Sequence, residues 1–289
     1  MTILEVIQRS TEFLAKRGVS SPRLQVELLL AHVLRLPRMR LYLEFERALT
    51  AVELETLREL VRRRGQREPL QYIVGSASFC GIELALDRQV LIPRPETELL
   101  AERGWKFLQE RSGAGGPPPL ALDIGTGSGC LAVALALKAP PAQIHATDLS
   151  AEALVLARRN AERHQVCDRV RFYQGDVFAA VPPDLRCDLI VSNPPYIPTA
   201  RIDTLEIEVR DFEPRTALDG GADGQDFYRR IAAQAPAFLR PAGRLMVELD
   251  EDGAEATCEL FRGEKWTIEA VEADYNQRPR ILIAHRTRA

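Results

Sequence analysis

Apolar residues recur at helical spacing through the first quarter of the chain. One face of the first predicted helix carries Ile3, Leu4, Val6, Ile7, Phe13 and Leu14. Ser21 followed by Pro22 predicts an N-cap and a second helix that continues through Leu36. Thr50 and Glu53 have the spacing of a capping box, which predicts the start of a third helix. The pattern therefore predicts a small helical domain.

Short runs typical of β-strands follow this helical region. The runs YIVG, SFCGIEL and QVLIP begin at Tyr72 and are separated by Gly and Asp, as expected of a hairpin. Pro93 and Pro95 end the pattern, and a helix is expected from Glu96 to Gln109. The segment RSGAGGPPP, Arg111 to Pro119, is expected to be a surface connection without a core.

From Leu120 onward, strand-like runs alternate with helical stretches. The strand-like runs are LALDI, IHATD, VRFYQ and DLIVS, and the helices are expected at Cys130–Lys138 and Ala151–Arg163. This alternation predicts an α/β fold, in which a parallel sheet carries helices on both faces. In such a sheet the ligand site lies at the carboxyl ends of the strands.

Length and charge favour two domains joined by a linker. The 289 residues, 46% of them apolar, exclude a disordered chain. We expect a helical domain over residues 1–75, a β-hairpin linker over 76–92 and a larger domain over 93–289. The first holds 13 basic and 9 acidic residues, a net charge of +4, against −7 for the remainder. Arg62, Arg63 and Arg64 form either a solvated helix end or a docking patch for an anionic partner.

Composition also argues against several classes of function. A net charge of −3 gives no electrostatic footprint of a stable nucleic-acid partner. The five cysteines and four histidines show no metal-ligand spacing, so no metal is expected. No apolar run is long enough to cross a bilayer, and Met1 to Ser10 lacks the features of a signal peptide. We expect a cytoplasmic protein, and the low aromatic content makes a monomer the default.

A glycine-rich turn follows the first strand of the α/β region. Its residues are Asp123, Ile124, Gly125, Thr126, Gly127, Ser128 and Gly129. The dinucleotide fingerprint would need Gly or Ala at position 130, where Cys130 stands, so the NAD interpretation is weakened. An acidic residue ahead of G-x-G-x-G instead resembles the cofactor loop of S-adenosylmethionine-dependent methyltransferases. A purely structural turn is the alternative.

Two further carboxylates follow the next strands. Asp148 ends IHATD, where a carboxylate can accept hydrogen bonds from ribose hydroxyls, although a role near the start of the following helix is the alternative. Asp176 and Val177 follow VRFYQ, where they could meet an adenine ring. Gly175-Asp176 alone would be an ordinary turn.

The fourth strand ends in Ser192-Asn193-Pro194-Pro195-Tyr196, the most informative stretch of the sequence. Two prolines stiffen the chain and remove two backbone donors, so the turn presents acceptors to a ligand. The Asn193 side-chain oxygen and the Pro194 carbonyl could accept both N–H groups of a planar amide or amine. Tyr196 could form an aromatic wall.

The sequence resembles the release factor glutamine methyltransferase family, also called HemK. The N-P-P-Y motif is typical of methyltransferases that act on planar nitrogens. The wider resemblance lies in PLQYIVGSASFCG (residues 69–81), VLIPRPETELL (90–100), LDIGTGSGCLAVALA (122–136), VSNPPYIP (191–198) and FEPRTALDGGADGQDFYRRI (212–231).

The resemblance implies a Rossmann-like class I methyltransferase with a predominantly parallel seven-stranded sheet and a small helical N-terminal domain. It implies methyl transfer from S-adenosylmethionine, with S-adenosylhomocysteine as product, to the N5 amide of the Gly-Gly-Gln glutamine in class I release factors. The implied contacts to the methyl donor are Asp123, Gly125, Thr126, Gly127, Ser128, Gly129, Asp148, Asp176, Val177 and Asn193. Asn193, Pro194, Pro195 and Tyr196 would hold the substrate glutamine, and Asn193, Pro194 and Tyr196 would act in catalysis. The basic N-terminal domain is expected to orient the protein substrate.

Other interpretations stay open at this point. A ribosomal-protein glutamine methyltransferase shares much of the pattern, and an N6-adenine nucleic-acid methyltransferase would also present acceptors to a planar amine. A non-catalytic sensor of S-adenosylmethionine would not need the acceptors. The sequence departs from the family at Asp250 and over Asp274–Arg280, where a glycine is expected, and both departures are expected to lie away from the site.

Overall fold

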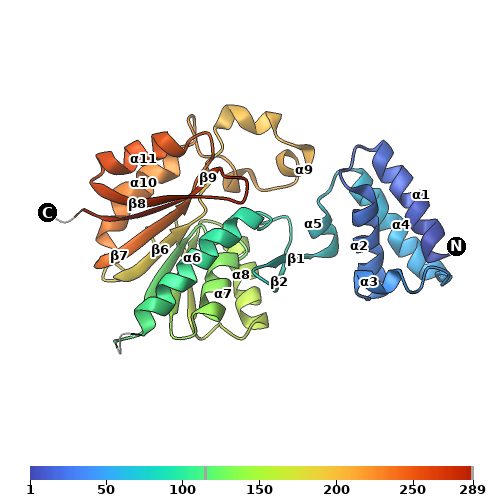
Figure 1. Cartoon of the computed structure of the whole chain (residues 1–289), viewed down its shortest axis with the longest axis horizontal. Coiled ribbons are helices and arrows are strands. Elements are labelled where there is room, and N and C mark those ends of the chain that lie inside the picture. Colours follow the sequence, from blue (N-terminus) through green and yellow to red (C-terminus); the bar gives the residue numbers. More distant parts are fainter. Residues whose placement is uncertain (114–115, 288–289) are drawn as a thin grey trace. The chain divides into compact units, whose positions relative to one another are not determined.

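The computed structural model describes residues 1–113 and 116–287 and divides the chain into two compact units (Figure 1). The first unit comprises Met1–Ser76 together with Glu206–Phe212, a segment that lies far away in the sequence. The second unit comprises the rest of the chain. The inclusion of Glu206–Phe212 in the first unit is a tertiary feature that the sequence pattern does not indicate.

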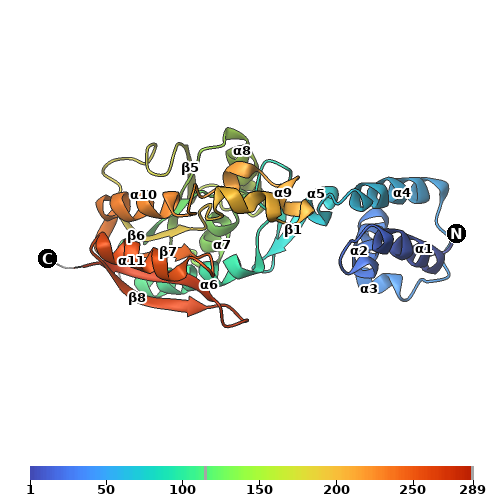
Figure 2. The same ribbon diagram turned by 90° about the horizontal axis from the view of Figure 1, so that it is seen from above.

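The first unit is a helical bundle (Figure 2). Its helices are α1 (Ile3–Lys16), α2 (Pro22–Leu34), α3 (Arg38–Leu41), α4 (Ala51–Gly65), α5 (Leu70–Val74) and α9 (Ile207–Arg210). The predicted capping box begins α4, because Thr50 Oγ1 accepts a hydrogen bond from the Glu53 N–H and Glu53 accepts one from the Thr50 N–H. Its core consists of aliphatic side chains, among them Ile3, Ile7, Leu14, Leu29, Leu30 and Leu41.

One sequence prediction for this unit is confirmed and two are corrected. Ser21 is the N-cap of α2 and Pro22 begins the helix, as predicted, but Ser21 has left-handed backbone angles (φ 47°) and its side chain makes no cap hydrogen bond. The same helix ends at Leu34, two residues before the predicted end. The run from Tyr72 to Gly75, predicted as a strand, belongs to helix α5 and its C-cap.

The second unit is built on a seven-stranded sheet. Its strands are β3 (Leu120–Ile124), β4 (Gln143–Asp148), β5 (Val170–Gln174), β6 (Cys187–Ser192), β7 (Leu239–Glu248), β8 (Trp266–Ala273) and β9 (Pro279–Arg286). The strand order is β5-β4-β3-β6-β7-β9-β8. The first five strands of this order are parallel, and β9 is antiparallel to both of its neighbours. The predicted fold class, with its predominantly parallel seven-stranded sheet, is confirmed.

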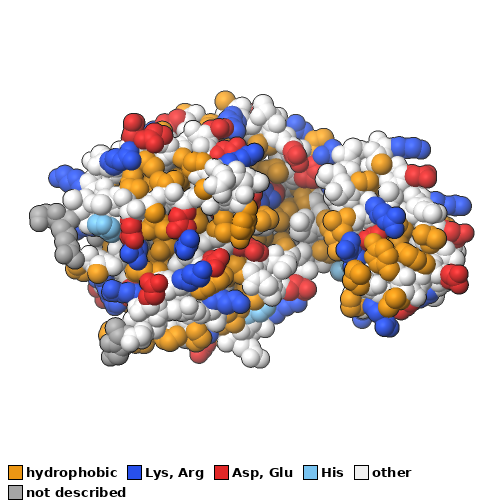
Figure 3. Space-filling view, viewed as in Figure 1, with side chains coloured by type: hydrophobic (Ala, Val, Ile, Leu, Met, Phe, Trp, Pro, Cys, Tyr) orange, Lys and Arg blue, Asp and Glu red, His pale blue; other side chains and the backbone are white. Residues whose placement is uncertain are grey.

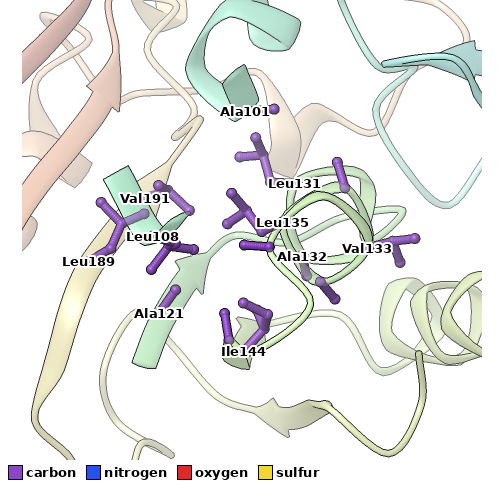
Figure 4. Close-up of a cluster of buried hydrophobic side chains, with 14 of the residues drawn as sticks. Ala101, Leu108, Ala121, Leu131, Ala132, Val133, Leu135, Ile144, Leu189 and Val191 are labelled. Atoms are coloured by element: carbon purple, nitrogen blue, oxygen red, sulfur yellow. The ribbon is translucent and has the colours of Figure 1, made fainter. Parts of the chain in front are cut away.

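Helices cover both faces of this sheet. They are α6 (Pro95–Ser112), α7 (Cys130–Lys138), α8 (Ala151–Arg163), α10 (Asp226–Gln234) and α11 (Ala254–Gly263). Alanine and leucine side chains of α6 and α7 pack against β3, β4 and β6, as Figure 4 shows for Leu131, Leu135, Ile144 and Leu189. A second core lies between the other face and helices α10 and α11. Each fully buried aliphatic side chain contributes roughly 1.5–3 kcal/mol.

Short elements connect these layers. β1 (Ser76–Phe79) and β2 (Ile82–Ala85) form the hairpin, whereas the predicted strand QVLIP adopts no regular strand. Three 3₁₀ turns are present at Thr199–Thr204, Arg215–Ala217 and Ala235–Ala237. The connection predicted at 111–119 begins within α6, and its residues 114 and 115 lie outside the described residues.

The order of the strands places two loops side by side. β3 pairs with β4 on one side and with β6 on the other, so the chain reverses its direction of winding between β3 and β6. This is the topological switch point, at which open α/β sheets bind ligands. The glycine-rich turn follows β3 and the Asn-Pro-Pro-Tyr turn follows β6, so the fold brings both turns to this point.

Candidate active site

A cavity of about 310 Å³ lies at the carboxyl ends of β3, β4, β5 and β6. Eight of the predicted site residues line it: Gly125, Gly127, Asp148, Asp176, Val177, Asn193, Pro194 and Pro195. Asp123, Thr126, Ser128, Gly129 and Tyr196 are not among its lining residues. The site predicted from four separate turns is therefore assembled around one cavity, with part of the predicted set behind its walls.

The glycine-rich turn forms an open cradle at one end of the cavity. Gly125 and Gly127 have φ of 71° and 54°, and a Cβ atom built on either would meet nothing within 4 Å. The Gly127 N–H donates to Asp148 Oδ2 at 2.8 Å, and the Ser150 N–H donates to Asp148 Oδ1 at 2.9 Å. Burial raises the pKa of Asp148. Ser150 caps α8 through the Ala153 N–H, so the N-cap of that helix is Ser150, whereas Asp148 faces the cavity.

Asp123 supports the turn from below. It is fully buried, and its Oδ2 accepts a hydrogen bond from Thr126 Oγ1 at 2.6 Å, while Oδ1 has no hydrogen-bond partner among the described residues. Burial raises the pKa of Asp123 to about 7, whereas the Thr126 hydrogen bond and the nearby Ala132 backbone N–H act in the opposite direction. Behind the turn, buried Asn160 of α8 donates to the Ser128 and Ala85 carbonyls and so ties the loop to β2.

The turn after β5 forms another wall. Val177 lines the cavity with a φ of 52°, which is unusual for a β-branched residue and marks local backbone strain. Thr147 Oγ1 donates to the Val177 carbonyl at 3.1 Å and helps to hold this conformation. The carboxylate of Asp176 also lines the cavity but forms an ion pair with Arg230 at 2.6 Å.

The Asn-Pro-Pro-Tyr turn is fixed at both ends. Ser192 Oγ donates to the Ile124 carbonyl at 2.8 Å, which joins the ends of β6 and β3. Asn193 Nδ2 donates to Thr97 Oγ1 at 3.0 Å, and no described residue donates to Asn193 Oδ1. The Tyr196 hydroxyl donates to Glu248 Oε1 at 3.1 Å. The turn therefore presents Asn193 Oδ1 as an acceptor, while the hydroxyl of Tyr196 is held by a carboxylate.

A neighbouring loop braces this turn. The Ile197 N–H donates to the Leu218 carbonyl and the Gly220 N–H donates to the Ile197 carbonyl. A Cβ atom at Gly224 would lie 2.4 Å from the Tyr196 carbonyl oxygen, so the two backbones approach too closely for any other residue type. The segment after Phe212, for which the sequence indicates only a family resemblance, therefore supports the turn.

The sequence motifs did not predict a site role for several of the lining residues. They are Gln89, Val90, Leu91, Ile124, Thr147, Leu149, Ser150, Ala153, Gly175, Ser192, Pro214, Thr216, Ala217 and Phe227. Some of these residues come from the segments 90–100 and 212–231. An ion pair joins the two segments, because the Arg94 guanidinium lies 2.7 Å from the Glu213 carboxylate. Their place directly after a strand was the signal that could have identified several of them, because the loops at the carboxyl ends of parallel strands form such cavities.

Neither departure from the family pattern lines the cavity, as predicted. Asp250 lies two residues after Glu248, whose side chain contacts the site residue Tyr196. Arg280 ends the second departure, and its positive charge favours the ionised form of Glu248, although burial raises the pKa of that carboxyl overall. Without a glycine, the turn between β8 and β9 is formed by Gln277 with a φ of 64° and by backbone N–H groups that donate to Asp274.

The described residues contain no group of three or more His, Cys, Asp or Glu side chains arranged to hold a metal ion. Over the same residues, no helix combines the length and apolar character that crossing a membrane would require. The cysteines with described environments are unpaired thiols, and burial raises the pKa of Cys130 and Cys187 to about 12.

The fold and the cavity define a class I methyltransferase. Residues 5–75 match the model of the PrmC N-terminal domain, and residues 115–207 match the methyltransferase small domain. The release factor glutamine methyltransferase of Geobacter sulfurreducens is 47% identical over 90% of this chain and 88% of its own length. That of Chlorobaculum tepidum is 45% identical over 97% and 96%. The chain belongs to the release factor glutamine methyltransferase family, which confirms the resemblance seen in the sequence.

A solved structure supports the fold independently. A methyltransferase from Pyrococcus furiosus aligns with a TM-score of 0.54 and 21% identity, over 73% of this chain and 92% of its own. At this identity the likeness concerns the fold alone.

Proposed function

We propose that this protein transfers a methyl group from S-adenosylmethionine to the side-chain amide nitrogen of the Gly-Gly-Gln glutamine in class I release factors. The observation that carries the proposal is the orientation of Asn193, whose Nδ2 is occupied by Thr97 and whose Oδ1 is left as an acceptor at the cavity. Membership of the family supports the same substrate.

The cavity fits the adenosyl part of the methyl donor. The open cradle of Gly125 and Gly127 admits a ligand against the backbone, and Asp148 retains lone pairs for ribose hydroxyls beyond the two N–H groups that it already accepts. Leu149 and Val177 offer apolar surface to a planar base. When bound, S-adenosylmethionine would supply a methyl group activated by its positively charged sulfur.

The residues of the turn would act by orientation. An amide nitrogen is a weak nucleophile because its lone pair is delocalised into the carbonyl. Asn193 Oδ1 and the Pro194 carbonyl would accept both N–H groups of the glutamine and direct the nitrogen toward the methyl group. Orientation of this kind can lower a barrier by roughly 7–11 kcal/mol. The two acceptors also stabilise the positive charge that develops on nitrogen, and the surplus proton can leave to water.

The first unit would hold the protein substrate. Exposed apolar side chains gather on one face of this unit (Figure 3). The exposed apolar residues in and directly after α2 and α3 are Leu24, Leu28, Met39, Tyr42 and Leu43. Met39 and Leu43 are 65% and 78% exposed, which is unusual for side chains of this size. The three arginines at the end of α4 are a weaker candidate for docking, because each pairs with a carboxylate within this unit.

The experiment that tests the activity is mass spectrometry of purified class I release factor after incubation with this protein and S-adenosylmethionine. We expect one methyl group, located by peptide fragmentation on the glutamine of the Gly-Gly-Gln loop. Parallel reactions with adenine-containing DNA or RNA and with ribosomal proteins test the alternatives. Methylation of one of these with unmodified release factor would overturn the proposal.

The role of the first unit is tested separately with the double variant Met39→Ser, Leu43→Ser. We expect the KM for intact release factor to rise by about three- to tenfold, as for the loss of a small apolar contact area, while the KM for a Gly-Gly-Gln peptide stays unchanged. Val52→Ser on α4 is the matched control, because Val52 is equally exposed but lies on another helix. An unchanged KM for intact release factor in the double variant would exclude this docking surface.

A further inference from the structure

Thr97 and Glu248 form a hydrogen-bonded chain with Asn193 that ends in a fully buried carboxylate. Thr97 is 2% exposed and Glu248 is 1% exposed. Thr97 Oγ1 donates to Glu248 Oε2 at 2.6 Å and accepts from Asn193 Nδ2 at 3.0 Å. The three residues come from α6, from β7 and from the turn after β6, and none of the sequence motifs identifies the first two as site residues.

When Glu248 is ionised, the chemistry of the groups fixes the direction of every hydrogen bond in this chain. An ionised carboxylate can only accept, so Glu248 requires Thr97 to donate its single hydroxyl proton. The Thr97 oxygen then has only lone pairs to offer its other neighbour. Asn193 must therefore turn its NH₂ group toward Thr97, which leaves Oδ1, the acceptor, at the cavity. A hydroxyl free to rotate would tolerate the opposite orientation of the amide.

Burial raises the pKa of Glu248, and several neighbouring groups act in the opposite direction by favouring its ionised form. The Tyr196 hydroxyl donates to its second oxygen at 3.1 Å, and the Arg280 guanidinium acts on it electrostatically from β9. Tyr228 of α10 donates to the Glu248 carbonyl at 2.7 Å and so fixes the backbone at this position. Among the described residues, both carboxylate oxygens thus have a donor, which is the condition under which a buried charge is tolerated.

We propose that Thr97 and Glu248 are positioning residues that select the amide orientation of Asn193 and so make the Asn-Pro-Pro-Tyr turn an acceptor site. Neither side chain lines the cavity, and both act through Asn193. The inference rests on the proposed function, because it is the planar N–H₂ group of the substrate that needs an acceptor. The wrong orientation of Asn193 would present two donors to that group.

The test compares Thr97→Val with Thr97→Ser. Valine keeps the shape of threonine but removes the hydroxyl, whereas serine restores it. For Thr97→Val we expect kcat with release factor to fall about 100-fold, as for a misoriented reacting group, while the Kd for S-adenosylmethionine changes less than about twofold. Thr97→Ser should recover most of the lost activity. Thr257→Val is the matched control, since Thr257 is equally buried and donates through its hydroxyl in α11 but lies away from the cavity residues.

Glu248→Gln tests the other end of the chain. The glutamine amide can donate as well as accept, so the direction of the Thr97 hydrogen bond is no longer determined. We expect kcat to fall in this variant too. The double variant Thr97→Val, Glu248→Gln should have a kcat within about threefold of that of the slower single variant, because both changes act on one hydrogen-bonded chain. Losses that multiply in the double variant, or wild-type kcat in Thr97→Val, would refute the proposal.

A second readout does not depend on the substrate. The side-chain NH₂ signals of Asn193, assigned by their loss in Asn193→Ala, should show slowed exchange with solvent in the wild type and fast exchange in Thr97→Val. Unchanged exchange in Thr97→Val would refute the positioning role even if the release factor proved not to be the substrate. Inactivity of the wild-type protein on release factor, with the expected change in exchange, would refute the proposed function alone.

Discussion

Asp123 is a buried carboxyl whose substitution by asparagine should increase the stability of the protein at neutral and alkaline pH. One of its oxygens accepts from Thr126, and the other is buried without a partner among the described residues. Burial raises the pKa of Asp123 to about 7 from a reference value of 3.8. The folded protein therefore binds this proton more tightly than the unfolded chain does, and stability declines as pH rises from about 4 to about 7.

The magnitude follows from this difference. A shift of roughly three pKa units, at about 1.4 kcal/mol each, corresponds to about 4 kcal/mol of destabilisation when the penalty is complete above pH 7. At pH 5 the ionisation of Asp123 destabilises the folded protein by about 1.5 kcal/mol, so this destabilisation grows by about 2.5 kcal/mol between pH 5 and pH 8. In the Asp123→Asn variant, the new side chain would place a buried NH₂ group where the unpartnered oxygen lies, at a cost of about 1–3 kcal/mol that does not vary with pH.

The assay is urea unfolding of wild type and Asp123→Asn at several pH values between 5 and 8, without S-adenosylmethionine. The free energy of unfolding of the variant relative to wild type should rise by about 2–3 kcal/mol across this range. Asp184→Asn is the control, because it makes the same substitution at an exposed position. Parallel curves for wild type and Asp123→Asn would show that the carboxyl is not raised by burial.

Other predictions concern the cavity and the segments that support it. Asn193→Ala should lower kcat by about 100-fold or more with little change in the Kd for S-adenosylmethionine, whereas Asp148→Ala should mainly raise that Kd. Single-turnover kinetics measure the first effect and calorimetry the second, and wild-type turnover in Asn193→Ala would contradict the proposed mechanism. Gly224→Ala should lower the free energy of unfolding by about 2 kcal/mol or more and also lower kcat, because the new Cβ would lie 2.4 Å from the Tyr196 carbonyl oxygen. A melting temperature equal to that of the wild type would contradict this prediction. Glu208→Gln should lower the stability of the first unit by about 2 kcal/mol at pH 7, because its two arginine partners lower the pKa of Glu208 to about 2 despite its burial. In the wild type, the stability contributed by Glu208 is fully present above the pKa of the unfolded chain and is lost as the pH falls through about 2. The difference in melting temperature between wild type and Glu208→Gln, measured by circular dichroism, should therefore decrease as the pH is lowered.

The sequence alone was sufficient for the large features of the catalytic unit. The alternation of strands and helices after Leu120 predicted the sheet, and the turns at Gly125 and Asn193 follow adjacent parallel strands in the structure. These features are local in origin, because periodicity and turn chemistry act over a few residues. The family resemblance supplied the strand number and the substrate.

The errors and omissions have physical reasons. The run from Tyr72 to Gly75 is apolar and rich in β-branched and aromatic residues, a composition that short strands and buried helical turns share. Pro69 before this run and Gly75 after it, the typical boundaries of a helix, were the signal that distinguishes the two. Thr97 and Glu248 could not be found in this way, because they lie 96 and 55 residues from Asn193 in sequence and meet it only through the packing of α6 and the pairing of β6 with β7.

The register of the sheet explains why Glu248 can serve the turn. Ser192 pairs with Val247 across the parallel strands β6 and β7, so the residues that come next are Asn193, directly after β6, and Glu248, the last residue of β7. A slip of one residue in β7 would turn Glu248 to the opposite face of the sheet and bring a leucine or valine to its place. The tight antiparallel pairing of Glu248 with Ile281 on β9 opposes such a slip. The orientation of one amide in the active site therefore depends on strand pairing that extends across three neighbouring strands, β6, β7 and β9, and a substitution that loosens β9 should lower kcat before it affects the binding of the methyl donor.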